Sequence, residues 1–226
     1  MRKVYTDAME EAPWDMDWLA TDRIQNLTDG VFAIAMTILV FNLTTPIDFD
    51  PTGILGILYS LGPQFFAYFL SFAALATFWV GHHNHSAYIR RLDRPFLWIN
   101  IFFLSFIVLI PFSTGMLGHY YKDPLAIIVY GTNLLICGVG MYWYWSHATT
   151  HHLLVDADLD EQKIITMKDR VLIPLIILVL TMGGALISPA LGLLMFLGIV
   201  SLAITPTSTD HLFKILAHAV HKYLKV

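Results

Sequence analysis

Long apolar stretches with few or no charged residues constrain this chain more than any other feature. From Val171 to Ile204, for example, no charged residue occurs. About 20 apolar residues are needed for a helix to cross the hydrocarbon core of a membrane, and hydrocarbon offers the backbone no hydrogen-bonding partner. Only 13% of the 226 residues are charged, against roughly a quarter in a soluble domain. The sequence therefore predicts an all-α, polytopic membrane protein.

Six transmembrane helices account for these stretches. We expect spans over residues 24–44, 54–80, 96–116 and 125–145, and two more within 171–204. Gly62-Pro63 predicts a kink in the second span. Ser188-Pro189 divides the last stretch into two short halves. We favour two spans there, and a re-entrant pair is the alternative.

The basic residues predict the orientation. Lys122 is the only one of the 13 Lys and Arg residues that falls on its side of the predicted membrane. An excess of Lys and Arg marks cytoplasmic segments. Both termini are therefore expected in the cytoplasm, which requires an even number of spans.

Three segments follow from this arrangement. Residues 1–22 are expected to form an acidic cytoplasmic segment, which differs from the basic start of a cleavable signal peptide. Residues 23–205 are expected to form the six-helix transmembrane domain. Residues 206–226 are expected to form an amphipathic cytoplasmic helix. That last helix could lie on the inner leaflet or pack against its own protein. No basic domain suited to nucleic acid is present, and Cys137, the only cysteine, is expected to serve packing.

The first span begins with unusual polarity. Arg23, Thr28 and Asp29 fall at its start. A carboxylate at the centre of a transmembrane helix costs about 2.5–3.5 kcal/mol, so an aspartate near the membrane is expected to have a partner. Asp29 either begins the span and stays hydrated or joins Arg23 in a buried polar network that fixes this helix against its neighbours.

One stripe of the same helix suggests a pore. Gly30, Ile34, Thr37 and Phe41 share a face by their spacing. Around a common axis, copies of this stripe would form an apolar constriction with a ring of hydroxyls. Apolar constrictions gate by dewetting, and hydroxyl oxygens can replace part of a cation's hydration shell. Ordinary helix packing also favours Gly, Ala and Thr, so the pattern alone leaves both interpretations open.

Three ordered motifs resemble a known family. The first span opens with Arg23-x-x-x-Leu27-Thr28-Asp29, the second contains Phe78-Trp79-x-x-His82-His83, and the third contains Asn100-x-x-Phe103-Leu104 and then Pro111-Phe112. Together they resemble the transmembrane protein 175 family, over roughly residues 23–115. Leu27 and Thr28 stand where that family's motif has Phe and Ser, and both changes keep the chemical character of the position.

The resemblance implies a potassium-permeable leak channel, a homotetramer of a single six-span repeat in the cell membrane, the inner membrane of a prokaryote. By position, Ile34 matches the narrow hydrophobic gate, Thr37 the selectivity-tuning hydroxyl and Phe41 the next pore-facing layer. Phe41 is bulkier than the aliphatic residue expected there, which bears on conductance. The charged pair and its polar partners on neighbouring helices would be Arg23, Asp29, Trp79, His82 and Asn100. No cofactor and no catalytic residue are implied.

Two alternatives from other classes remain. A secondary transporter would use broken helices, for which Gly62-Pro63 and Gly183-Gly184 are candidates. A histidine-based membrane metalloprotein could use His147 and His151, which are spaced to share a metal if helical. The histidines clustered at residues 82–85 are the other source of ligands.

Overall fold

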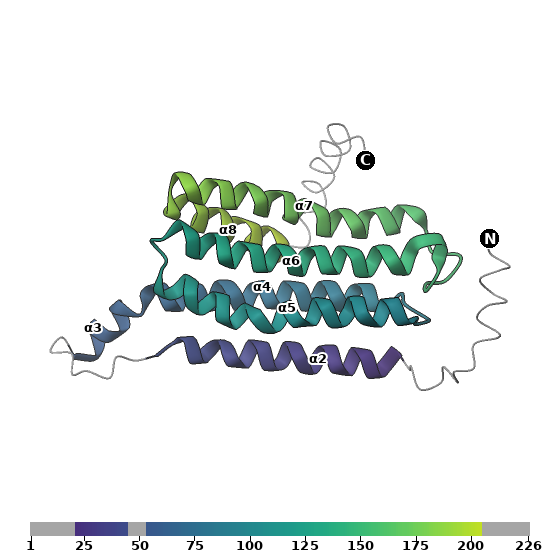
Figure 1. Ribbon diagram of the computed structural model, residues 1–226, viewed down its shortest axis with the longest axis horizontal. Coiled ribbons are helices and arrows are strands. Elements are labelled where there is room, and N and C mark those ends of the chain that lie inside the picture. The colour runs from purple at the N-terminus through teal and green to yellow at the C-terminus, as the bar shows by residue number, and fades with distance from the viewer. Residues whose placement is uncertain (1–20, 45–52, 205–226) are drawn as a thin grey trace.

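The computed structural model describes residues 21–44 and 53–204, and helices dominate both ranges (Figure 1). The predicted N-terminal segment, up to residue 20, and the C-terminal amphipathic helix lie outside the described residues. The helices are α2 (Thr21–Ile38), α3 (Gly53–Ser60), α4 (Gly62–Ser86), α5 (Arg94–His119), α6 (Pro124–Thr149), α7 (Glu161–Ile187) and α8 (Pro189–Ile204), with short 3-10 turns η2 (Leu39–Asn42) and η3 (Thr150–His152).

The predicted all-α membrane architecture is confirmed. Five of the described helices are long and apolar enough to cross a membrane, and α8 is a shorter apolar helix. The 16 residues of α8 rise about 24 Å, less than the hydrocarbon thickness of about 30 Å. Helix α8 returns alongside α7 after the turn at Ser188-Pro189, where the sequence predicted a division.

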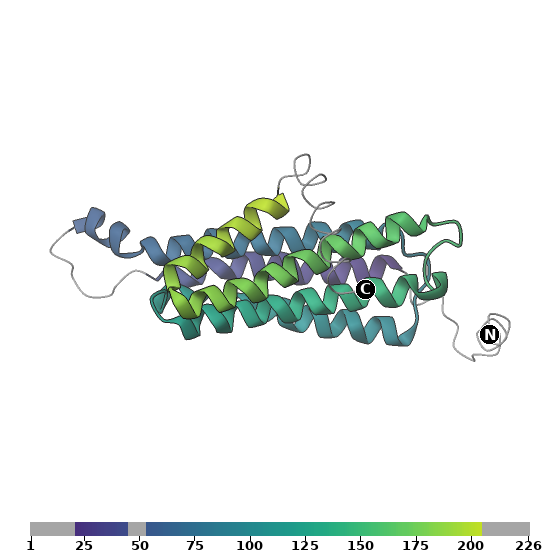
Figure 2. The ribbon, with the colours of Figure 1, turned by 90° about the horizontal axis from the view of Figure 1, so that it is seen from above.

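The second predicted span differs most from its expected bounds. The chain breaks at Leu61 into α3 and α4, and α3 projects away from the bundle (Figures 1 and 2). Pro63 lies in the first turn of α4, where its missing N–H costs no helical hydrogen bond. At the other end α4 continues to Ser86 rather than ending at Val80, so the clustered histidines are helical.

Aspartates begin three of the helices. Asp93, Asp123 and Asp160 each precede a helix and accept a hydrogen bond from a backbone N–H of its first turn. Such caps satisfy N–H groups that have no intrahelical partner. Each of these loops therefore ends at an aspartate that caps the next helix and so fixes where that helix begins.

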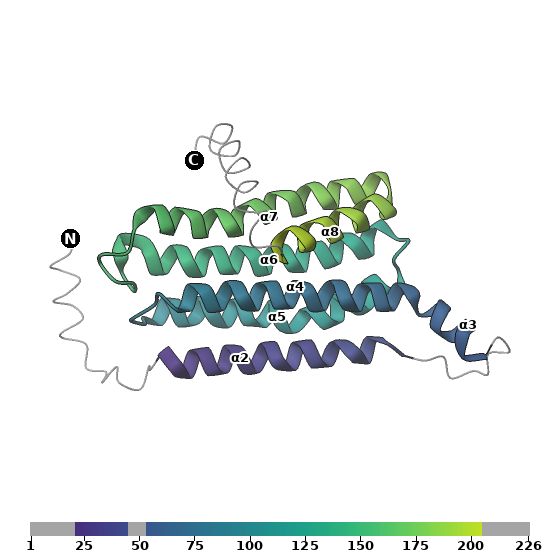
Figure 3. The same cartoon turned by 180° about the vertical axis from the view of Figure 1, so that it is seen from behind.

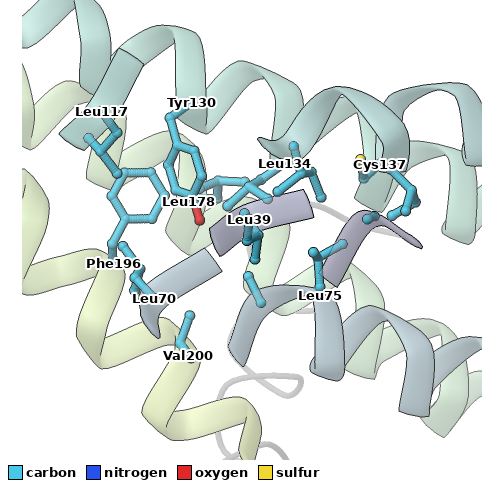
Figure 4. Close-up of a cluster of buried hydrophobic side chains, with 14 of the residues drawn as sticks. Leu39, Leu70, Leu75, Leu117, Tyr130, Leu134, Cys137, Leu178, Phe196 and Val200 are labelled. Carbon is cyan, nitrogen blue, oxygen red and sulfur yellow. The ribbon is translucent and has the colours of Figure 1, made fainter. Parts of the chain in front are cut away.

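The bundle is layered, with α2 along one side, α4 and α5 next to it, and α6, α7 and α8 beyond (Figures 1 and 3). One apolar cluster joins residues from all of these helices. Leu39, the first residue of η2, belongs to this cluster together with Leu70, Leu75 and Leu134 (Figure 4). Helix α2 is anchored on one face only, and it is the least buried of the five spans.

A second apolar cluster closes the end of the bundle that carries the basic loops. It includes Phe96 and Trp145, both almost completely buried. Above it the α4–α5 loop meets the η3–α7 loop, because the backbone N–H groups of Arg90 and Arg91 both donate to Leu154 O. We refer to this end, where α2, α5 and α7 begin, as the basic end.

Candidate pore helix and its polar contacts

Helix α2 has two clearly different faces. Thr28, Phe32, Ala35 and Leu39 are buried against the rest of the chain. The opposite face is exposed within a single chain, and it is apolar: Ile34 is 59% exposed and Phe41 75%, while Phe32 is only 1% exposed. Exposure of such an apolar face to water is unfavourable, so this face is expected to contact lipid or another protein surface.

The predicted stripe falls on this exposed face. Gly30, Ile34, Thr37 and Phe41 are all exposed, and no side chain of the described residues approaches within 4 Å of a Cβ placed on Gly30. The Thr37 hydroxyl donates a hydrogen bond to Ile34 O at 2.9 Å. Its proton is therefore directed along the helix, and the oxygen lone pairs remain available on the exposed side.

A buried chain of hydrogen bonds holds the other face of α2. Asn100 Nδ2 on α5 donates to Thr28 Oγ1 at 3.2 Å, and Asn100 Oδ1 lies 3.1 Å from His82 Nε2 on α4. All three side chains are at most 4% exposed. The His82 ring also stacks on Phe103, 5.8 Å between centroids with only 5° between planes. Three helices thus meet at one amide.

Asp29 and Arg23 lie at the edge of this network rather than within it. Trp79 Nε1 donates to Asp29 Oδ1 at 2.8 Å, and both side chains are exposed in the single chain. Arg23 is exposed, and its side chain forms no hydrogen bond or ion pair within residues 21–44 and 53–204. The pairing of Arg23 with Asp29 in a buried network is therefore not present within one chain, and Thr28 occupies the buried position instead.

The sequence did not single out the contact that anchors the far end of α2. Asn42, the last residue of η2, donates from Nδ2 to Pro111 O at 2.9 Å. A Cβ added to Gly115, one turn further along α5, would lie 2.7 Å from Asn42 Oδ1. An Asn that ends an apolar span was the available signal, because such an amide requires a partner.

A second buried polar group joins α4, α5 and α6. Thr114 Oγ1 lies 2.8 Å from Ser71 Oγ, and Ser71 Oγ lies 3.0 Å from the hydroxyl oxygen of Tyr130, so the three hydroxyls form one hydrogen-bonded chain. All three residues are at most 1% exposed. Their helical spacing gave no sign of this contact, since it depends on how three helices pack.

The histidines point in separate directions. His83 stacks on Trp79 and His85 stacks on Trp145. His147 lies 2.9 Å from Asp93 Oδ2, while His151 has a positive φ of 52° and breaks the helical spacing that a shared metal would need. Within the described ranges no group of three or more His, Cys, Asp or Glu side chains is arranged to hold a metal ion.

Of the two helix breaks expected for a transporter, the structure has one. Gly62-Pro63 does begin a new helix, although at the end of the bundle opposite the basic end. Gly183-Gly184 lies within α7, which continues unbroken to Ile187. A midplane site between two broken helices therefore has no counterpart among the described helices.

Comparison with known proteins identifies the family. Residues 23–111 match the family described as endosomal/lysosomal potassium channel TMEM175. A potassium channel of Chamaesiphon minutus is 32% identical over 161 residues, covering 69% of this chain and 78% of that protein. A potassium channel of Streptomyces collinus is 29% identical over 175 residues, covering 76% and 85%.

The fold agrees with a solved structure of the same kind. The crystal structure of a lysosomal potassium-selective channel TMEM175 homolog from Chamaesiphon minutus superposes with a TM-score of 0.70 and 25% identity, covering 82% of this chain and 98% of that chain. The endosomal/lysosomal proton channel TMEM175 of Homo sapiens is 25% identical over 145 residues, which are 59% of this chain and 29% of that larger protein. By sequence and by fold, this multi-pass membrane protein belongs to the TMEM175 family.

Proposed function

We propose that this chain forms a potassium-permeable cation channel, a homotetramer in which α2 of each subunit lines a central pore. The observation that carries the proposal is the pair of faces on α2. One face is fixed by a buried hydrogen bond to Asn100 on α5, which also bonds His82 on α4, and the other presents Ile34, Thr37 and Phe41 with no partner among the described residues. Relatives that carry the name potassium channel support the choice of ion.

In this proposal Ile34 forms the narrowest ring. Apolar side chains around a narrow pore exclude water, and this sets a barrier to hydrated ions. Thr37 lies one turn further along α2, with its hydroxyl proton donated to Ile34 O. The oxygen lone pairs then face the axis and replace part of the hydration shell of a cation. Phe41 forms the next apolar layer.

Selectivity by this arrangement is modest. A potassium channel filter of the usual kind surrounds each ion with rings of backbone carbonyls, whereas α2 would offer one hydroxyl from each subunit. The flux is passive, and the proposed mechanism uses no catalytic residue, nucleotide or cofactor. We place the channel in the cell membrane, with the basic end in the cytoplasm, because Lys and Arg favour that side.

The experiment is ion flux through liposomes that contain the purified protein. Ile34→Asn introduces a polar side chain at the constriction and should raise potassium flux. Val108→Asn is the matched control, because Val108 is 54% exposed and lies on α5, outside the proposed pore-lining helix, and should leave flux unchanged. Absence of potassium flux in both the native protein and Ile34→Asn would refute the channel. Saturable flux that depends on a counter-ion would indicate a transporter instead.

A further inference from the structure

The last turn of the proposed pore helix is wound more tightly than the rest. After Ile38 the chain continues as the 3-10 turn η2, Leu39–Asn42. A 3-10 helix turns 120° per residue instead of 100°, so three residues add roughly 60° relative to a regular α-helix. Phe41 therefore points in a direction that the helical spacing from Ile34 and Thr37 does not predict, and η2 sets that direction.

Asn42 holds this turn in place. Its Nδ2 donates to Pro111 O on α5 across 69 positions of sequence, at 2.9 Å and partly buried. Leu39, at the other end of the turn, is fully buried in the apolar cluster of the bundle. In apolar surroundings an unpaired amide is costly. The turn is thus fixed at both ends while Val40 and Phe41 stay exposed between them.

Gly115 shapes the seat for the Asn42 amide. A Cβ at this position would lie 2.7 Å from Asn42 Oδ1 and 3.5 Å from its Cγ. The amide can reach Pro111 O only because α5 has no side chain here. Any larger residue at position 115 would displace the amide, and with it the end of α2.

From these contacts we propose that Asn42, bonded to Pro111 and seated on Gly115, is a positioning residue that sets the direction of Phe41 and thereby the width of the pore at this end of α2. The effect on pore width rests on the proposed channel function. The orientation of the turn does not, and it can be measured independently of ion flux.

The test labels a cysteine placed at the end of α2. Phe41→Cys supplies the thiol, and the native Cys137 is fully buried and gives little background. The rate of modification by a membrane-impermeant thiol reagent is then compared with Asn42 intact, with Asn42→Ala and with Gly115→Ala. Loss of one hydrogen bond should change the rate by on the order of fivefold.

A double variant separates the proposed contact from general loosening. In Asn42→Ala the side-chain amide is absent, so a methyl group at position 115 no longer has an amide to clash with. The labelling rate of Asn42→Ala/Gly115→Ala should therefore equal that of Asn42→Ala alone, although each single change alters it. Unchanged labelling in both single variants, or effects that simply add, would overturn the role of Asn42. Gly115→Ala keeps the test valid if Asn42→Ala does not fold.

Potassium flux with native Phe41 tests the second half of the proposal. Asn42→Ala should change the flux and the potassium-to-sodium preference. Asn84→Ala is the control, because Asn84 is exposed near the end of α4, at the basic end and so at the opposite end of α2 from Asn42. Altered labelling with native flux in Asn42→Ala would overturn the link to pore width. Altered labelling without any flux in the native protein or Ile34→Asn would refute the channel and leave the orientation of the turn established.

Discussion

Asn100 donates from Nδ2 to Thr28 Oγ1 at 3.2 Å while its Oδ1 lies 3.1 Å from His82 Nε2, so a single side-chain amide joins α2, α5 and α4. The Asn100 amide cannot form hydrogen bonds with bulk water instead, because the residue is only 1% exposed. Its two partners therefore fix the rotation of α2 about its own axis. That rotation decides which residues of α2 face away from the bundle.

Thr28→Val should destabilise the protein. The substitution keeps the shape of the side chain but leaves Asn100 Nδ2 without an acceptor, which costs about 1–2 kcal/mol. Thr28→Ser keeps the hydroxyl and should cost less than about 1 kcal/mol, the value of one buried methyl group. Thermal unfolding of the detergent-purified protein measures both changes. Equal unfolding midpoints for the two variants would show that this hydrogen bond does not contribute.

Asp93→Ala should cost more stability than Asp123→Ala. Both aspartates cap a helix with Pro in its first turn, and each cap contributes roughly 1 kcal/mol. Asp93 also bonds His147, at 2.9 and 3.1 Å, and so ties the start of α5 to the end of α6. The difference should be about 0.5–1.5 kcal/mol. The account of this pair fails if the two variants unfold at the same temperature.

Gly138→Ala should disturb the packing of α6 on α7. A Cβ at Gly138 would collide with the side chain of Leu175, so either Leu175 must adopt another conformation or the two helices must separate. Overpacking of this kind costs typically about 1–3 kcal/mol. Gly183→Ala is the control, because nothing lies within 4 Å of its added Cβ. The yield of folded protein on size exclusion and its unfolding midpoint should fall for Gly138→Ala only.

Thr37→Val should reduce the preference for potassium over sodium. Valine matches threonine in size but lacks the oxygen that is proposed to contact the ion, and we expect a change in the permeability ratio of roughly two- to fivefold, the scale of one polar contact. Thr37→Ser retains the oxygen and should keep most of the preference. Reversal potentials under mixed ionic conditions measure the ratio. An unaltered ratio in Thr37→Val would exclude the hydroxyl from ion selection.

Hydropathy was sufficient to predict the order of the apolar helices, because each crossing requires its own apolar stretch, but only five of the six predicted spans are long enough to cross a membrane and α8 is shorter. Helix ends were predicted less well. Val80 was expected to end a span that continues to Ser86, since hydropathy falls at the histidines although the helix does not stop there. The break at Gly62-Pro63 was expected as a kink, and only the structure separates α3 from α4.

The polar contacts between helices could be predicted only where the residues involved belong to a motif shared with a known family. Trp79, His82 and Asn100 came from a family resemblance, and the structure brings them to α2. Asn42, Pro111 and Gly115 form an equally specific contact; the position of Asn42 signals that its amide needs a partner, but no local pattern identifies that partner, because it depends on the packing of helices about 70 residues apart in sequence. What covers the exposed face of α2 cannot be predicted from local sequence, and in the proposed channel it would be the same helix of other subunits.

Disulfide cross-linking at Ile34 tests most directly whether copies of α2 meet around one axis. Ile34→Cys, oxidised in the membrane, should give covalent dimers, because neighbouring Cα atoms in a narrow ring approach within the roughly 7 Å that a disulfide allows. Phe112→Cys, at a 66% exposed position on α5, should remain uncross-linked under the same conditions. If Ile34→Cys remains a single 25.6 kDa chain, α2 faces lipid and the proposed pore does not exist.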